Sequence, residues 1–219
     1  MSNIIFITNK NNEMQERPID YIREKFGNID IRFAGLNGSV KMHETIKVSG
    51  KLSIICGDNS SVSIGPHNVF EKFVIHASNT NCKIEIGERN NLRNAMLFAN
   101  GEPGLTIKIG NDCLFSTNIV FRASDGHTIF DLTTREVINR PVRGISIGNH
   151  VWIGQNVTIL KNVSIPDDCI IGIGSIVSSK VFLKNSIIAG IPAKIIKTNV
   201  SWDRKSISSF DVNYVPLIS

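Results

Sequence analysis

The sequence predicts a mainly β protein built as a parallel β-helix, and three observations lead to that fold class. Isoleucine is unusually frequent, with 35 among 219 residues, whereas there are only two tryptophans and two tyrosines. Aliphatic residues recur at every sixth position between Ile147 and Val177. Neither a helical period nor plain strand alternation gives a spacing of six, but a three-sided coil of short strands does, because each side places one aliphatic residue inward before the chain turns. Such a coil has about 18 residues.

The six-residue pattern is unbroken in the later part of the chain and interrupted in the earlier part. The later inward positions are Ile147, Ile153, Ile159, Ile165, Ile171 and Val177. Earlier, Ile64, Ile86 and Ile109 each precede a glycine and stand 22 and 23 residues apart (86 − 64 and 109 − 86), which is one coil plus four or five residues of corner loop. We therefore expect the β-helix at about residues 46–190.

Three segments do not follow this pattern. Residues 1–45 predict a small α/β cap, with strands at Ile4–Thr8 and Ile29–Phe33 and a helix over 18–26, which would shield the edge of the first coil. Residues from about 123 to 144 are polar and lack the period, so they predict a projecting loop, the kind of segment that serves a site or an interface. Residues 191–219 predict a C-terminal arm or short helix over the last coil.

Composition excludes several classes of protein. With 42% hydrophobic residues the chain is too apolar for disorder, and it contains no run of 18 apolar residues that would insert in a membrane. The first residues lack the basic start of an export signal, so a cytoplasmic protein is expected. The net charge of +5 (24 − 19) favours polyanions without choosing among them, and we expect no nucleic-acid partner. Four scattered cysteines without a C-x-x-C pair indicate buried thiols.

Several strings of residues resemble the hexapeptide-repeat acyltransferases. These are GNHVWIGQNVTI (148–159), GIGSIVSSK (172–180) and AGIPAKIIK (189–197). Within that family, FRASDGHTIFD (121–131) and NVSWDR (199–204) are similar to bacterial enzymes that O-acetylate polysialic acid and related capsular polysaccharides. The resemblance covers about residues 60–204. It implies a left-handed β-helix, acetyl-coenzyme A as the donor, and a homotrimer with active sites between neighbouring subunits.

The resemblance assigns the catalytic base to His127, where the coil gives way to the loop. Histidine suits this role, since an unperturbed imidazole takes up and returns a proton near neutral pH. Asp125 is a candidate for orienting the imidazole, although a carboxylate in such a turn also bonds local backbone amides. Trp152 should point outward from its strand and, by resemblance, lies beside the histidine; the alternative is packing between subunits. The Gln155 backbone N–H matches the family's oxyanion donor.

Coenzyme A requires backbone groups along its pantetheine arm and cations at its phosphates. The resemblance places the arm along Gly172, Ile173 and Ser178, and the phosphates near Lys194 and Lys197. Glycines permit close backbone approach, and lysine supplies a point charge for phosphate. Ordinary solvated lysines are the alternative. No metal is required, because a zinc site of the β-helical carbonic anhydrase type would need a third histidine beside His67 and His76, and none is evident.

The sequence thus predicts an acetyl-coenzyme A-dependent O-acetyltransferase acting on a sugar hydroxyl of a bacterial surface polysaccharide. We expect direct attack in a ternary complex, since no cysteine or serine occupies an evident nucleophile position. Two alternatives remain open: an N-acetyltransferase for a nucleotide-linked amino sugar, and a non-catalytic trimeric scaffold. Arginines in or near the loop are candidates for attracting an acidic acceptor, namely Arg122, Arg135, Arg140 and Arg143.

Overall fold

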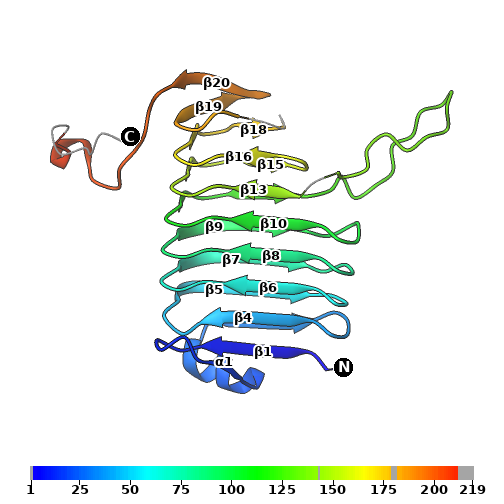
Figure 1. Cartoon of the computed structure of the whole chain (residues 1–219), viewed down its shortest axis with the longest axis vertical. Helices are drawn as coiled ribbons and strands as arrows, with labels where there is room; N and C mark the ends of the chain where they lie inside the picture. Colours follow the sequence, from blue (N-terminus) through cyan, green and yellow to red (C-terminus); the bar gives the residue numbers. More distant parts are fainter. Residues whose placement is uncertain (1, 143, 179–181, 212–219) are drawn as a thin grey trace.

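The chain winds into a tall three-sided prism in the computed structural model, which describes residues 2–142, 144–178 and 182–211 (Figure 1). Each coil contributes strands to the three sides, and equivalent strands of successive coils pair in parallel and in register. The expected parallel β-helix is confirmed. We call the sides face 1, face 2 and face 3 in the order in which the chain visits them, and the edges 1/2, 2/3 and 3/1.

Face 1 is an eight-stranded sheet in the order β16-β13-β10-β8-β6-β4-β1-β2, parallel throughout except between β1 and β2. Its strands are β1 (Ile4–Thr8), β2 (Met14–Glu16), β4 (Ser39–His43), β6 (Ser61–Ile64), β8 (Lys83–Ile86), β10 (Thr106–Ile109), β13 (Ile145–Ile147) and β16 (Ser164–Ile165).

Faces 2 and 3 belong to one 12-stranded sheet that bends around edge 2/3. In the earlier coils a single long strand serves both faces: β5 (Lys47–Cys56), β7 (Val69–Ala77) and β9 (Asn91–Phe98). In the later coils a turn divides this path into two short strands. Face 2 then holds β11 (Leu114–Phe115), β14 (Trp152–Ile153), β17 (Ile170–Ile171) and β19 (Ser186–Gly190). Face 3 holds β3 (Ile29–Phe33), β12 (Ile119–Arg122), β15 (Thr158–Leu160) and β18 (Ile176–Val177).

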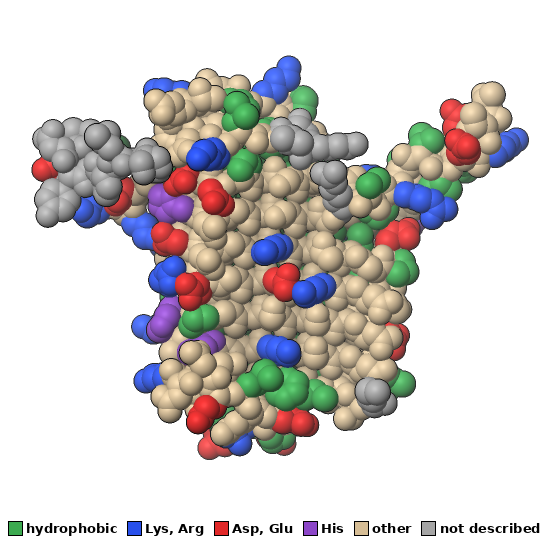
Figure 2. Space-filling view, in the orientation of Figure 1, with side chains coloured by type: hydrophobic (Ala, Val, Ile, Leu, Met, Phe, Trp, Pro, Cys, Tyr) green, Lys and Arg blue, Asp and Glu red, His purple; other side chains and the backbone are tan. Residues whose placement is uncertain are grey.

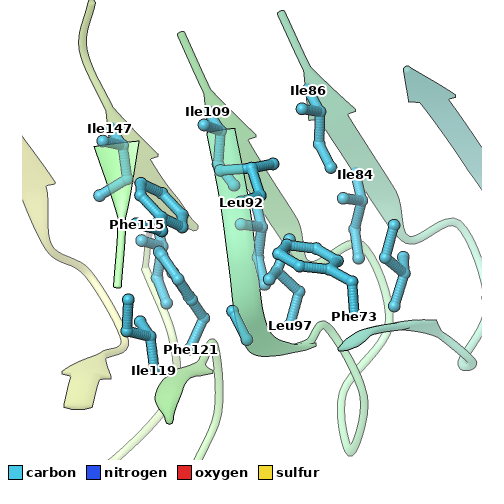
Figure 3. Close-up of a cluster of buried hydrophobic side chains, with 14 of the residues drawn as sticks. Phe73, Ile84, Ile86, Leu92, Leu97, Ile109, Phe115, Ile119, Phe121 and Ile147 are labelled. Atoms are coloured by element: carbon cyan, nitrogen blue, oxygen red, sulfur yellow. The ribbon is translucent and has the colours of Figure 1, made fainter. Parts of the chain in front are cut away.

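The interior of the prism is a continuous stack of aliphatic and phenylalanine side chains (Figure 3). Alternate residues of each strand point inward, so that Leu97, Phe121 and Ile159 occupy equivalent places in three successive coils and are fully buried. Burying one such side chain contributes roughly 1.5–3 kcal/mol. The six-residue period therefore records the inward position of each side, as the sequence predicted.

Edge 1/2 is made by residues with left-handed backbone conformation stacked one above another. Arg89, Asp112, His150 and Asp168 occupy this position in successive coils, with φ between +51° and +57°. Just inside the same edge, the buried amide of Asn90 accepts from Cys113 N and donates to Gly110 O of the next coil, at 2.7 and 3.0 Å. These contacts keep the coils in register at the edge, so side chains projecting from it lie in a column.

The N-terminal segment is part of the prism, which corrects the expected start of the β-helix at residue 46. The strands expected at Ile4–Thr8 and Ile29–Phe33 form, as does the helix, α1 (Ile19–Phe26). However, β1 pairs in parallel with β4, and β3 with β5, so the ladders of the coil run on into this segment. α1 lies across the first coil and buries Ile22 (Figure 1). The helix therefore closes the end of the prism while the strands extend it.

Two segments leave the prism on opposite edges (Figure 1). The expected projecting loop extends from edge 3/1 as a long excursion, in which Phe130 and Val137 form an antiparallel bridge. At the other end, Ala193–Thr198 is a strand, β20, antiparallel to β19, and this hairpin covers the last coil. Of the expected arm or short helix, the chain therefore continues as an arm after a strand, with no α-helix among the described residues of 191–211. The chain then descends along edge 1/2 and includes a 3₁₀ turn, η1 (Ile207–Ser209). Among the described residues, no helix has the length and apolar character to cross a membrane.

Candidate active site

His127 lies on edge 3/1 at the base of the projecting loop. β12 ends at Arg122, and the Ser124 hydroxyl donates to Asn100 O at 2.6 Å, which fixes the point where the chain departs. The left-handed Gly126, with φ +80°, then turns the backbone outward. His127 is exposed and lines a small pocket together with Thr128, Asn139 and Arg140 of the loop. The imidazole is thus accessible to a substrate, as a base must be.

Asn139, from the returning side of the loop, fastens the backbone at His127 and just after it. Its amide nitrogen donates to His127 O at 2.8 Å, and its amide oxygen accepts from Ile129 N at 2.8 Å. One side-chain amide thus bonds a backbone carbonyl and a backbone N–H, as a neighbouring strand would, and holds the segment that carries the imidazole at two points. The same amide nitrogen also donates to Asp125 Oδ2 at 2.9 Å.

The Asp125 carboxylate faces Lys161 and Asn139. Lys161, which follows β15 in the next coil, forms an ion pair with Asp125 Oδ2. This lysine ammonium is the main cause that holds the pKa of Asp125 below its ordinary value, opposed by partial burial and assisted by Asn139. Asp125 therefore anchors the loop base to the coil. Among the described residues, the hydrogen-bond partners of the carboxylate are the Lys161 and Asn139 side chains, which are neither the His127 ring nor the local backbone amides of the two expected roles. Orientation of the imidazole by Asp125 stays a prediction.

Trp152 points outward from face 2, as the strand alternation predicts, and its side chain is 41% exposed. Its neighbours above and below in register are Ile170 and Leu114, so the indole forms part of an apolar column. The indole also lies 6.1 Å, between ring centroids, from Trp202 of the C-terminal arm. Face 2 thus presents an aromatic group in the coil next to the one from which the loop departs.

Gln155, Gly172 and Ile173 lie together on edge 2/3. The Gln155 carbonyl accepts from Gly174 N of the next coil at 2.8 Å, which stacks the two turns. A Cβ added at Gly172 would stand 2.8 Å from the Ala189 Cβ, so this position needs glycine for the close approach of the next strand. Ile173 is 71% exposed beside it. These residues form a smooth, exposed edge suited to an extended ligand.

Lys194 and Lys197 project from the same side of β20, although a spacing of three places residues of a regular strand on opposite sides. The register between β19 and β20 shifts at Ile187/Ile188, which inserts one extra residue in β20. Lys194 consequently pairs with Ala189 and Lys197 with Ile187, two residues that share one face of β19. Ala189 is the neighbour of Gly172. The bulge thus places two exposed lysines on one side of β20, with Lys194 at the Gly172 end of the strand and Lys197 nearer to edge 1/2.

The chain does not bring all these residues to one place. Asp125, His127 and Ser178 lie on edge 3/1, because each follows a strand of face 3. Trp152 lies on face 2, whereas Gln155, Gly172 and Ile173 lie on edge 2/3. The two groups therefore occupy different sides of one prism. A site that uses both groups must be assembled from two copies of the chain.

The loop arginines are dispersed. The Arg122 guanidinium lies over the Phe98 ring, 5.3 Å from its centroid, and Arg140 lines the small pocket beside His127. Arg135 occupies a left-handed turn at the far end of the loop. Arg143 lies outside the described residues. Among the described arginines of this set, Arg140 is the one that lines a pocket together with His127.

The cysteines contribute no chemistry to this site. All four are free and buried, which agrees with the expectation of buried thiols. Burial raises the pKa of Cys113 to about 12 and that of Cys56 to about 11, so both are protonated at neutral pH. The described residues contain no group of three or more His, Cys, Asp or Glu side chains arranged to hold a metal.

Comparison with known proteins identifies the family. No family model matches the chain. The polysialic acid O-acetyltransferase of Neisseria meningitidis is 33% identical over 171 residues, which cover 78% of this chain and 78% of that protein. The chain belongs to the hexapeptide-repeat acetyltransferase family. A second relative, the polysialic acid O-acetyltransferase of Escherichia coli O1:K1, is 35% identical over 122 residues, and the chain covers only 38% of its length.

Solved structures agree with the family and the fold. The polysialic-acid-specific acetyltransferase NeuO superposes with a TM-score of 0.75 and 27% identity, covering 95% of this chain and 88% of that one. The polysialic acid O-acetyltransferase OatWY gives a TM-score of 0.59 and 28% identity, covering 85% and 92%. The expectations of a left-handed β-helix and of an acyltransferase are confirmed.

Several residues of the site carry no sequence signal. Asn139 and Lys161 sit 14 and 36 positions from Asp125, and only the fold brings the three together. Trp202 was visible in the string that resembles the polysaccharide enzymes, but its position beside Trp152 depends on the path of the arm.

Proposed function

We propose that this protein transfers an acetyl group from acetyl-coenzyme A to a hydroxyl of an acidic bacterial surface polysaccharide. The observation that carries the proposal is an exposed imidazole fastened at the base of the loop, on a β-helix whose relatives are polysialic acid O-acetyltransferases. Arg140 beside the pocket and the net charge of +5 favour an acidic acceptor. The cytoplasmic location stays a prediction.

His127 is the proposed general base. Its imidazole accepts the proton of the sugar hydroxyl while the hydroxyl oxygen attacks the thioester carbonyl carbon. The tetrahedral intermediate then collapses, the carbon–sulfur bond breaks, and the imidazolium returns the proton to the departing thiolate. The Gln155 N–H is the proposed donor to the oxyanion. Direct attack needs no covalent acetyl-enzyme, and the buried, protonated cysteines supply no alternative nucleophile.

The proposed donor groove follows edge 2/3 towards β20. Exposed Ile173 offers its backbone to the pantetheine amides, whereas the Gly172 N–H and carbonyl already bond Ile188 O and the Ser175 hydroxyl, so Gly172 contributes close approach alone. Ser178 completes the predicted set from edge 3/1. Lys194 and Lys197, on one side of β20, supply two positive charges for the phosphates. The residues present therefore fit an extended ligand with an anionic end.

The proposed assembly is a homotrimer, because two of the three faces carry outward apolar columns. On face 2 these residues are Leu114, Trp152, Ile170 and Ile187, and on face 3 they are Val74, Met96, Val120 and Ile176, with Thr158 in register between the last two. Face 1 is polar, with Ser63, Glu85, Lys108 and Ser146 in register, and Figure 2 shows few hydrophobic side chains over the middle of this wall. Two different apolar faces suit a head-to-tail contact that closes into a ring.

Such a ring would also reunite the divided site. Face 2 of one copy against face 3 of the next brings Trp152 towards the neighbouring edge 3/1, where that copy carries its own His127. The sedimentation coefficient of the purified protein tests the assembly. A monomer at working concentration with full activity would contradict it.

Acetyl transfer is tested with purified protein, acetyl-coenzyme A and three acceptors: polysialic acid, a neutral galactoside, and a nucleotide-linked amino sugar. Release of the coenzyme A thiol is followed for each acceptor, with His127→Ala as the control. We expect release with polysialic acid that depends on His127. Release with the amino sugar alone would identify an N-acetyltransferase, and failure to bind coenzyme A would favour a scaffold.

A further inference from the structure

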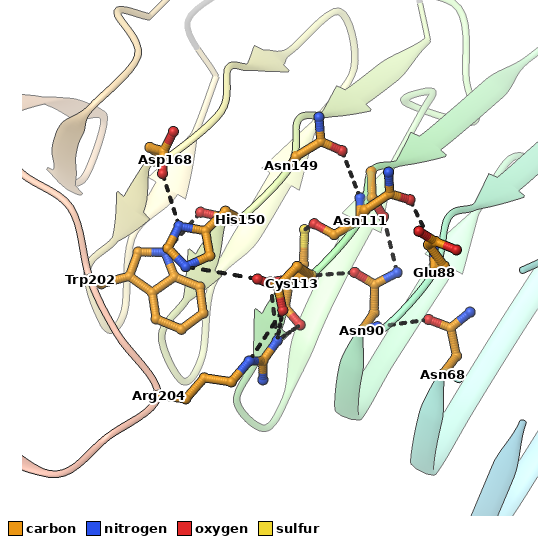
Figure 4. A network of polar contacts seen from close by, with 12 residues as sticks. Asn68, Glu88, Asn90, Asn111, Cys113, Asn149, His150, Asp168, Trp202 and Arg204 are labelled. Atoms are coloured by element: carbon orange, nitrogen blue, oxygen red, sulfur yellow. Dashed lines mark hydrogen bonds and ion pairs between the residues drawn. The ribbon is translucent and has the colours of Figure 1, made fainter. Parts of the chain in front are cut away.

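The C-terminal arm is fastened across three consecutive coils at edge 1/2 (Figure 4). Trp202 stacks on the His150 imidazole, with ring centroids 4.3 Å apart and planes within 8°, and its Nε1 donates to His150 O at 2.8 Å. Arg204 donates to Asp112 Oδ1 at 2.9 Å and to the carbonyls of Asp112 and Cys113 at 3.1 and 3.2 Å. A ring stack and several hydrogen bonds therefore hold the arm against the coils.

The arm packs on the stacked side chains of edge 1/2, namely Asp112, His150 and Asp168. His150 lies between Asp168 of the coil above, whose Oδ1 is 2.9 Å from its Nδ1, and Asp112 of the coil below, whose Oδ2 is 3.9 Å from its Nε2. The hydrogen bond to Asp168 restricts rotation of the imidazole, with the Asp112 carboxylate at ion-pair distance on its other side, and the plane of the ring sets the orientation of the Trp202 indole stacked on it. The Arg204 guanidinium also contacts the same indole, with its central carbon 5.6 Å from the ring centroid.

The indole fixed in this way lies next to Trp152. The two ring centroids are 6.1 Å apart with the planes tilted by 48°, a separation at which aromatic rings pack favourably. They are the only two tryptophans in the chain. Trp152 itself projects from face 2 and is 41% exposed, so the side chains that border it decide where its indole lies. Trp202 therefore limits the directions that the Trp152 indole can take.

We propose that Trp202 is a positioning residue for acetyl transfer: clasped by His150 and Arg204, it holds the Trp152 indole in the orientation that the acceptor sugar meets. This inference rests on the proposed function, because it takes Trp152 to form part of the acetyl-transfer site. Misplacing a group that orients a substrate lowers turnover without abolishing the chemistry. The arm is thus a part of the site contributed from beyond the repeats.

The kinetic test compares three variants of the full chain. Trp202→Ala removes the wall beside Trp152, whereas Trp202→Phe keeps an aromatic ring to stack on His150. Ile207→Ala is the control on the same arm, at a side chain that is 98% exposed. For Trp202→Ala we expect kcat/KM for the acceptor to fall by about tenfold, with the Kd for coenzyme A and the melting temperature unchanged. Trp202→Phe recovers most of the loss, and Ile207→Ala behaves as the wild type.

A second measurement reads the geometry without activity. Two indoles at this separation give an exciton couplet in far-ultraviolet circular dichroism, which we expect in the wild type and in Ile207→Ala. The couplet disappears in Trp202→Phe. A wild-type protein without the couplet would overturn the proposal, because the indoles would then not be held together in solution.

The remaining outcomes separate this inference from the proposed function. An unchanged acceptor kcat/KM in Trp202→Ala overturns the positioning role while acetyl transfer stands. A loss accompanied by a lower melting temperature and weaker coenzyme A binding, without recovery in Trp202→Phe, also overturns it, since that pattern is structural damage. If the wild type acetylates no hydroxyl acceptor although the couplet is present, the proposed function fails and the positioning role fails with it.

Discussion

The projecting loop and the C-terminal arm both leave the prism, but they end in different surroundings. The arm returns to its own coils, where Trp202 and Arg204 find aromatic, carboxylate and carbonyl partners. The loop is fastened at its base by Asn139 and Lys161, and its apolar side chains beyond the base remain open to solvent. These side chains are Ile129, Phe130, Leu132, Ile138 and Val142, which are 48–79% exposed.

The difference indicates what each segment is for. A segment whose apolar and charged groups are matched within one chain acts as a strap, and its contribution is intramolecular. A long loop with unmatched apolar groups marks a surface that meets another molecule. Together with the two apolar faces, the loop is consistent with a second copy of the chain as that partner, and with a base held where two copies would meet.

The largest effect should come from the imidazole at the base of the loop. His127→Ala removes the proposed general base, so we expect kcat to fall by about 10²- to 10⁴-fold with the circular dichroism spectrum unchanged. Thiol release from acetyl-coenzyme A with polysialic acid measures this. Full activity in the variant would remove His127 from the mechanism and leave the loop without its catalytic role.

The fastening of the loop base should matter next. Asn139→Ala frees the backbone at His127 and just after it, so we expect a fall in kcat of about tenfold to a hundredfold with the Kd for coenzyme A unchanged. Glu136→Gln, farther out on the same loop, is the control. An Asn139→Ala protein with normal kcat would show that the loop base needs no clamp.

The Asp125–Lys161 contact gives the loop base a defined response to pH. Because the folded-state pKa of Asp125 is lowered, the contact stabilises the folded loop above the unfolded carboxyl pKa of about 3.9, and this contribution is lost as the pH falls through the lower folded value. We expect Lys161→Met to remove that dependence, measured by proteolysis of the loop between pH 3 and 6, a range of about three units around the carboxyl pKa. Identical profiles for both proteins would contradict the contact.

The exposed loop side chains should affect assembly more than folding. In Leu132→Asn/Ile138→Asn, two apolar groups become polar at sites that are 76% and 64% exposed, so the melting temperature of the prism should not change. If the loop packs on a second copy, association weakens by about tenfold or more, since burying each side chain fully is worth roughly 1.5–3 kcal/mol. Sedimentation velocity over a dilution series measures the change. An unaltered association constant would show that the loop meets something else.

The smallest effect belongs to the ion pair of the arm. Arg204 and Asp112 are both more than a third exposed, so Arg204→Ala should change the free energy of unfolding by less than about 1 kcal/mol. Loss of the ion pair should nevertheless loosen the arm and make its backbone accessible to protease, so trypsin should cleave at Lys205 faster than in the wild type. Unchanged cleavage would mean that the stack of Trp202 on His150 suffices to hold the arm.

The first coils show where a periodic pattern stops being informative. Between Ile4 and His43 the strands are separated by α1 and by loops, so the six-residue interval is absent and the segment resembles a separate cap. In space β1 and β4 nevertheless pair in parallel, because an inserted helix does not prevent the chain from returning to the same side of the prism. Strand pairing depends on where the chain returns, which spacing along the sequence does not record.

By itself, the sequence determined the solenoid and the excursion at 123–144, because a coil with one inward aliphatic residue per side leaves its period in the chain. The resemblance to the family singled out His127 as the candidate base, and that role stays a prediction. Only the tertiary structure decided which groups meet: Asn139 and Lys161 at the loop base, two lysines on one side of β20 through a bulge, and Trp202 beside Trp152. The physical reason is that inward positions repeat with local geometry, whereas contacts between edges, loops and arms depend on how far each departing segment travels before it packs again.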